Sequence, residues 1–155
     1  MDPEDVRSFR PISNLSVVSK LLERLVARQL LEYLDRSGLL PRLQSVYRAC
    51  HSTENAVLKV LSDIPLDIDA GDRSALVLLD LSAAFDTVDH DILVRRLETS
   101  YGLSGSVLQW FQTYLVGRRQ YVRNGSSPTL IVCGVPQGSV LGPILFLLYT
   151  ATLLI

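Results

Sequence analysis

The chain has 155 residues, 48% of them apolar and 20% charged, which fits one globular domain and excludes a disordered chain or a fibrous repeat. Its formal net charge of −1 gives no whole-chain footprint for nucleic acid. The two cysteines are too few for a disulfide framework, and we expect both to be reduced, as in an intracellular compartment. The N-terminal MDPEDVRSFR lacks the apolar core of a signal peptide.

The charges are unevenly distributed along the chain. Residues 54–91 hold nine acidic and two basic residues, so the flanking segments are basic. An acidic middle between basic flanks fits a metal centre between surfaces that meet phosphate. A solvated acidic turn at Asp67, Asp69 and Asp72 is the alternative.

The N-terminal half predicts two helices. Apolar periodicity from Ser16 to Arg36 indicates a helix that Gly38 closes. A second helix begins at Ser52 or Thr53 and runs to about Ile64, where Pro65 ends or kinks it.

A strand is expected next. Residues 69–72 form a turn, and the run Ala75-Leu-Val-Leu-Leu79 is continuously apolar. Continuous apolarity over this length is typical of a strand buried on both faces. The strand would end at Asp80.

The C-terminal half mixes helices and strands. We predict helices over residues 89–100 and 104–117, then a strand pair over 118–123 and 129–133, joined through Asn124-Gly125. Residues 136–142 form a loop that leads into the uncharged stretch 140–155. This stretch is shorter than the about 20 residues that a spanning helix needs, so a buried helix is expected and a membrane tail is the alternative. The mixture predicts an α+β fold.

Two segments carry the residue types of a catalytic site. In VLLDLSAAFD, Asp80 is positioned at the exit of the predicted strand, where a carboxylate can bind Mg²⁺; a turn former or helix cap is the alternative. In CGVPQGSVLGP, glycines and prolines surround Gln137 just before a helix. Such a loop can bring backbone N–H groups to a ligand beside a helix N-terminus that favours phosphate, or it is an ordinary helix-entry turn.

Both segments closely resemble one family. DLSAAFDTVDH and CGVPQGSVLGPILFLLY are similar to the first two palm motifs of reverse transcriptases from non-LTR (long interspersed) retrotransposons. FRPISNLSVVSKLLERLVARQL and QSVYRACHSTENAV resemble the preceding fingers segments. The resemblance implies a partial right-hand polymerase, with fingers over about residues 1–74, the first part of the palm over about 75–155, and no thumb.

The resemblance also implies roles for single residues. Asp80 is the expected catalytic carboxylate, and with the backbone carbonyl of Leu81 it would bind the two Mg²⁺ ions. Phe85 would be the steric gate against a ribonucleotide 2′-hydroxyl, while Asp86 would brace the following turn. The remaining expected contacts are those to the nucleotide, from Arg10, Gln137 and Gly138, and those to nucleic acid, from Arg48, Arg118, Arg119 and Arg123. The partners implied are an RNA template, a DNA primer and deoxynucleoside triphosphates, in the nucleus or cytoplasm and without a membrane.

The chain departs from the family pattern in one respect that bears on activity. The family supplies further metal-binding carboxylates from an Ala-Asp-Asp motif after the apolar helix, but no Asp follows Asp91 here. We therefore expect a chain truncated before that motif, as a piece of a longer polyprotein or a decayed element. It would bind Mg²⁺ weakly and be inactive alone. The alternative function is a non-catalytic, nucleic-acid-binding remnant.

Overall fold

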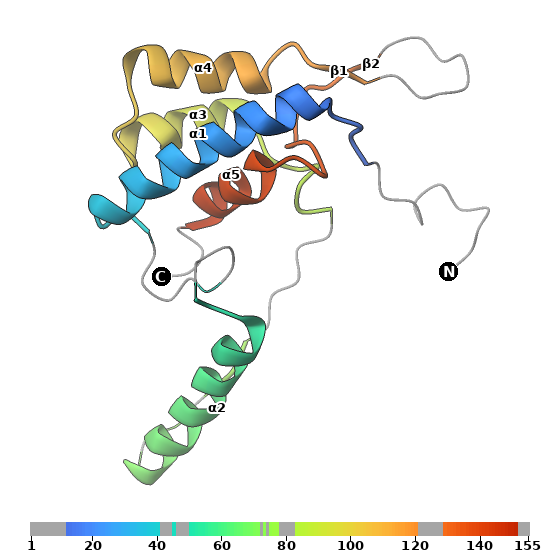
Figure 1. Ribbon diagram of the computed structural model, residues 1–155. Helices are drawn as coiled ribbons and strands as arrows, with labels where there is room; N and C mark the ends of the chain where they lie inside the picture. Colours follow the sequence, from blue (N-terminus) through green and yellow to red (C-terminus); the bar gives the residue numbers. More distant parts are fainter. Residues whose placement is uncertain are drawn as a thin grey trace, which may run out of the picture. The chain divides into compact units, whose positions relative to one another are not determined.

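The computed structural model describes residues 12–40, 45, 50–71, 73, 75–77, 83–120 and 129–151. The chain forms two compact units, one of Met1–Leu39 with Ala83–Ile155 and one of Leu40–Ser82. Figure 1 shows the helices and strands of the described residues. They are α1 (Val17–Arg36), α2 (Thr53–Asp69), α3 (His90–Thr99), α4 (Gly105–Leu115), β1 (Arg119–Gln120), β2 (Thr129–Leu130) and α5 (Leu141–Thr150).

Helix α1 begins and ends as the sequence predicts. The Ser16 hydroxyl accepts a hydrogen bond from the Ser19 N–H at 3.1 Å, which satisfies one free donor of the first turn. After the helix, Gly38 adopts a left-handed φ of 62°, and the Leu39 N–H donates to the Leu34 carbonyl at 2.9 Å. The predicted closure by Gly38 is therefore confirmed.

The core of the first unit is a stack of helices. Helix α3 packs against α4 and α5, and α1 packs against α5 (Figure 1). Most of α5 is buried, so the expected buried helix is confirmed. Within the described residues, no helix combines the length and apolarity required to span a bilayer.

The helix starts differ in how they are capped. Asp89 caps α3, because its Oδ1 accepts from the Ile92 N–H at 2.9 Å. Ser104 precedes α4 but its side chain forms no capping hydrogen bond.

The predicted strand pair is confirmed in a shorter form. Strands β1 and β2 are antiparallel, with Arg119 opposite Leu130. They make up the whole of the sheet structure in the part of the chain that the structure describes. The predicted Asn124-Gly125 turn lies outside the described residues.

Two predictions for the second unit are wrong. Helix α2 does not stop near Ile64 but continues through Pro65 to Asp69. The proline removes one backbone donor, yet helical bonding resumes after it, as in the 3.0 Å bond from the Ala70 N–H to the Leu66 carbonyl. Of the strand predicted over residues 75–79, residues 75–77 form no strand and are exposed, while residues 78 and 79 lie outside the described residues. A strand needs a neighbour for its N–H and C=O groups, and no described segment pairs with this one.

The α+β class and the division into fingers and palm stay predictions.

Candidate functional site

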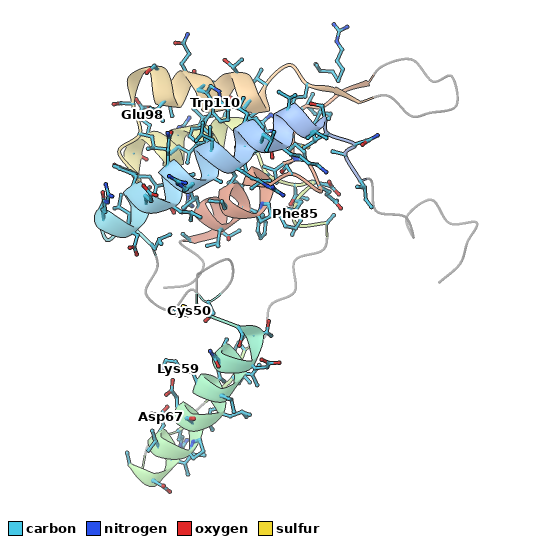
Figure 2. The ribbon with its side chains drawn as sticks, viewed as in Figure 1. Cys50, Lys59, Asp67, Phe85, Glu98 and Trp110 are labelled. Carbon is cyan, nitrogen blue, oxygen red and sulfur yellow. The ribbon has the colours of Figure 1, made fainter. Side chains whose placement is uncertain are left out.

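The first part of the site is a tight turn that carries Phe85. The Asp86 N–H donates to the Ala83 carbonyl at 2.8 Å, and Ala83 has a positive φ of 52°, which is costly for a residue with a Cβ. The half-buried Phe85 is labelled in Figure 2. Its ring lies 5.2 Å from the Phe146 ring of α5, tilted by 47°. Such pairs are attractive beyond their buried area, so the predicted gate residue is held by packing.

The glycine-rich loop, which we define as residues 133–139, is bound along this turn. The Val135 N–H donates to the Phe85 carbonyl, and the Gly134 N–H donates to the Val88 carbonyl, both at 2.7 Å. The His90 Nε2 bonds to the Gly134 carbonyl at 2.8 Å, so His90 has a structural role in holding this loop.

Gly134 is required by this close approach. It has a φ of 91°, and an added Cβ would lie 3.0 Å from both the Asp86 Cα and the Phe85 carbonyl oxygen. Neither backbone atom can move without breaking the turn, so a larger residue would push the loop away from it.

The central feature of the site is a pair formed by Gln137 and Asp86. The Gln137 Nε2 donates to the Asp86 Oδ1 at 3.0 Å and to its Oδ2 at 2.9 Å. Bonds to a charged acceptor are stronger than neutral ones, and both side chains are partly buried. Asp86 therefore orients the side chain that the sequence predicts to contact the nucleotide. From the sequence, Asp86 was expected to cap or brace the following turn; its bond to Gln137 was not predicted, and the signal for it was a second acid in the same motif.

The N-terminus of α5 is occupied by a side chain that sequence reasoning missed. Glu23 of α1 is 1% exposed, and its Oε2 accepts from the Val140 N–H at 2.6 Å. A carboxylate at this place satisfies free helix N–H groups and interacts favourably with the helix dipole. The expectation that this helix N-terminus favours phosphate is therefore wrong, because Glu23 already fills it. The only sequence signal was an acid at helical spacing from Ala27, Leu30 and Leu34.

Tyr114 of α4 completes this buried contact. Its hydroxyl donates to the Glu23 Oε1 at 3.2 Å, and its ring stacks at 5.4 Å on Trp110 of the same helix, which is labelled in Figure 2. Burial raises the pKa of Tyr114 above its ordinary value, and the nearby Glu23 charge raises the pKa further. A hydrogen bond with Ser139 lowers the pKa but does not outweigh burial. The phenol therefore stays protonated and able to donate near neutral pH.

An open pocket of about 630 Å³ lies beside the glycine-rich loop. It is lined by residues 12–15, Asp86, Arg118, Arg119 and residues 130–137. Arg118 lies with its guanidinium carbon 5.0 Å from the centre of the Tyr114 ring, and its buried Nη1 has no hydrogen-bond partner among the described residues. The pocket thus combines one carboxylate with two guanidinium groups, and it can accept a ligand that carries both anionic and hydrogen-bonding groups.

The structure places half of the predicted site residues. Phe85 and Gln137 lie together at the turn and the loop, while Gly138, with a φ of 89°, is exposed. Arg118 and Arg119 line the same pocket as Gln137. The predicted residues that lie outside the described part of the chain are Arg10, Arg48, Asp80, Leu81 and Arg123.

The described residues contain no group of three or more His, Cys, Asp or Glu side chains that could hold a metal ion. Asp86, the acid nearest to Gln137, uses both of its oxygens on that side chain. The predicted metal ligands, Asp80 and the carbonyl of Leu81, lie outside the described residues.

The family model that matches this chain and two of its curated relatives are described as reverse transcriptases or RNA-directed DNA polymerases. A family model described as "Reverse transcriptase (RNA-dependent DNA polymerase)" matches residues 2–155. The chain is 37% identical over 153 residues to the "Probable RNA-directed DNA polymerase from transposon BS" of Drosophila melanogaster, which covers 97% of this chain and 17% of that protein. It is 36% identical over 146 residues to the "Probable RNA-directed DNA polymerase from transposon X-element" of the same species, covering 92% of this chain and 16% of that protein.

A more distant relative is the "Retrovirus-related Pol polyprotein from type-1 retrotransposable element R2" of Popillia japonica. It is 31% identical over 157 residues, covering 94% of this chain and 20% of that protein. The chain thus spans a fifth or less of the length of these relatives. No solved structure matches it.

Proposed function

The chain belongs to the reverse transcriptase family, with relatives among non-LTR retrotransposons, and we propose that it forms the nucleotide-binding part of an RNA-directed DNA polymerase. In this proposal, the pocket beside the glycine-rich loop receives part of a deoxynucleoside triphosphate or of the template base paired with it. The complete enzyme would add the nucleotide to a DNA primer on an RNA template. The corresponding fold would be α+β, the fingers and first part of the palm of a right-hand polymerase.

The observation that carries the proposal is the Gln137–Asp86 pair. A side-chain amide that is already fixed loses little conformational freedom when a ligand binds, so it can contribute to affinity and orientation. With Nε2 held by Asp86, the side-chain oxygen of Gln137, Oε1, is the group of this side chain that would contact a base or sugar. Phe85 is fixed against Phe146 on the turn whose backbone binds the loop, and we propose that its ring excludes a 2′-hydroxyl, although it does not itself line the pocket.

The remaining roles follow the family pattern. We propose that Asp80 and the carbonyl of Leu81 hold Mg²⁺, which would stabilise the charge that develops on the phosphates during transfer. Arg10 would contact the triphosphate. Arg48, Arg118, Arg119 and Arg123 would contact phosphates of the nucleic acid, where such contacts supply affinity without sequence preference.

A second function is favoured by one observation. No Asp follows Asp91 in these 155 residues, so these residues alone supply one predicted metal-binding carboxylate, Asp80, for two metal ions. The chain by itself would then bind nucleic acid without extending it.

Nucleotide binding by the purified chain tests the proposal. We expect a fluorescent dATP analogue to bind in the presence of Mg²⁺, more tightly than the matching ATP analogue. Gln137→Ala should weaken binding about tenfold or more, the effect of losing a hydrogen bond worth about 1.4 kcal/mol. Gln112→Ala, on the exposed face of α4, is the matched control. Absence of dATP binding, or equal effects of the two substitutions, contradicts the proposal.

Primer extension separates polymerase from nucleic-acid-binding remnant. The segment of the transposon BS polymerase that matches this chain is replaced by the chain, and RNA-templated DNA synthesis is measured. Synthesis that is lost in Asp80→Asn supports the polymerase. A chimera without synthesis, together with salt-sensitive binding of an RNA–DNA hybrid by the chain alone, supports the remnant.

A further inference from the structure

Glu23 is a buried carboxylate that joins three helices. It projects from α1, its Oε1 accepts from the Tyr114 hydroxyl of α4 at 3.2 Å, and its Oε2 lies at the start of α5. There it accepts from the Val140 N–H at 2.6 Å, with the Leu141 N–H at 3.5 Å. Only 1% of the surface of Glu23 is exposed, so protein N–H and O–H groups take the place of water as hydrogen-bond donors to its carboxylate.

This contact does more than fill space in the core. Desolvating a carboxylate is expensive unless several donors replace water, and an apolar residue of similar size would avoid that cost. The next donor along α5 is satisfied separately, because the Gly142 N–H donates to the Ser139 hydroxyl at 2.8 Å. Glu23 and Ser139 together therefore fix the first turn of α5 at its junction with the glycine-rich loop.

The fixed turn is directly connected to Gln137. Val140 follows Gln137 by three residues, and the Gln137 carbonyl accepts from the Ser13 N–H at 2.9 Å. Ser13 belongs to the segment that leads into α1, the helix that carries Glu23. The loop is thus tied to the α1 segment on both sides of Gly138, at Gln137 and at Val140. Asp86 holds the Gln137 side chain from another direction.

We propose that Glu23 is a positioning residue for Gln137. Its carboxylate holds the first turn of α5 in place at Val140. Because Gln137 lies only three residues before Val140, this contact also fixes the backbone of Gln137, and so the position of the side-chain amide that binds Asp86 and would bind the ligand. The statement about the ligand rests on the proposed nucleotide-binding function. The statement about position stands on the contacts of Glu23, Val140 and Gln137 alone.

The test compares Glu23→Leu with a matched destabilised variant of the full chain. Leu34→Ala removes a fully buried side chain eleven residues further along α1, about 16 Å away at 1.5 Å per residue. It lowers the melting temperature without touching the loop. For both variants, two quantities are measured: the NMR signals of the Gln137 side-chain NH₂ group, and the affinity for the fluorescent dATP analogue with Mg²⁺.

The proposal predicts a clear separation between the two variants. Glu23→Leu shifts the Gln137 signals and weakens nucleotide binding about tenfold or more. Below its melting temperature, Leu34→Ala leaves the Gln137 signals in place and changes the affinity by no more than about twofold. Glu23→Gln, whose amide oxygen can still accept from Val140, restores most of both. If Glu23→Leu does not fold, Glu23→Asp withdraws the carboxylate by one methylene and is expected to give the same change in smaller degree.

Two results would overturn the proposal. The first is an unchanged Gln137 signal in the folded Glu23 variants. The second is an equal loss of signal and affinity in Leu34→Ala, which would show that only global stability matters. If the unmodified chain binds no dATP but the Gln137 signals still separate the variants, the proposed function fails while the positioning role of Glu23 holds.

Discussion

Helix α1 has two apolar faces, of which one is buried and the other is largely exposed. One face, with Ala27, Leu30 and Leu34, is buried together with Glu23. The other face, formed by Val17, Val18, Leu21, Leu22 and Leu25, is largely exposed. At 3.6 residues per turn the two faces lie on roughly opposite sides of the helix. A charged residue of α1 is therefore buried while several large apolar residues are exposed. The face that is buried is the one that packs against α5 and finds hydrogen-bond donors there, so hydrophobicity alone does not decide which face is buried.

The largest expected effect is on the buried face. Leu34→Ala should lower the free energy of unfolding by about 2–5 kcal/mol, because it leaves a cavity among packed helices. Chemical denaturation with circular dichroism measures this loss. A cost below about 1 kcal/mol would mean that α1 is not part of the core.

A smaller effect is expected from the buried polar contact. Tyr114→Phe removes the hydroxyl that donates to Glu23 but keeps the ring stacked on Trp110. The loss should be about 0.5–1.5 kcal/mol, measured in the same way. Thr113→Ala changes a neighbouring exposed residue and serves as the control. Equal stability of the wild type and Tyr114→Phe would remove the phenol from the account of how Glu23 is held.

The exposed face should respond least at neutral pH. Leu21→Ala should change stability by no more than about 0.5 kcal/mol, since Leu21 is 56% exposed. The informative quantity is the ratio to Leu34→Ala in the same denaturation series. A cost for Leu21→Ala close to that of Leu34→Ala would remove the distinction between the two faces.

Alkaline pH provides a separate probe of the buried face. Burial raises the pKa of Tyr114 above 10.0, so the unfolded chain loses this proton first and stability falls as pH rises past about 10. Below that value the contribution is fully present. Tyr114→Phe should flatten this decline, with a residual slope from Tyr101, whose pKa burial also raises. A decline that is identical with and without the Tyr114 hydroxyl contradicts the assignment.

Local patterns were enough to predict most helices of the fold. Periodic apolar residues closed by Gly38 predicted α1, and an acid at position 89 followed by a periodic stretch predicted α3, because these signals act within a few residues. The same reasoning failed at residues 75–77, where an apolar run alone cannot specify a strand without a partner. It also stopped α2 too early at Pro65, because a single missing donor does not end a helix.

The sequence predicted which residues form the site, but not which hydrogen bonds hold them together. The glycine-rich loop and Phe85 were identified from their motifs, and the structure brings their backbones together. The bonds that hold the loop join residues far apart in the sequence, with 51 positions between Asp86 and Gln137 and 117 between Glu23 and Val140. Periodicity and spacing report on neighbours along the chain, so they cannot reveal which distant donor a buried acid will meet.

The most direct test of this account is hydrogen exchange at one amide, the N–H of Val140. This group precedes the first helical bonds of α5, and its partner is the Glu23 carboxylate at 2.6 Å. We predict that the Val140 amide exchanges slowly in the unmodified chain and becomes fast in Glu23→Leu while the amides in the middle of α5 stay protected. Fast exchange of Val140 in the unmodified chain would contradict the claim that a buried carboxylate of α1 holds the glycine-rich loop in place.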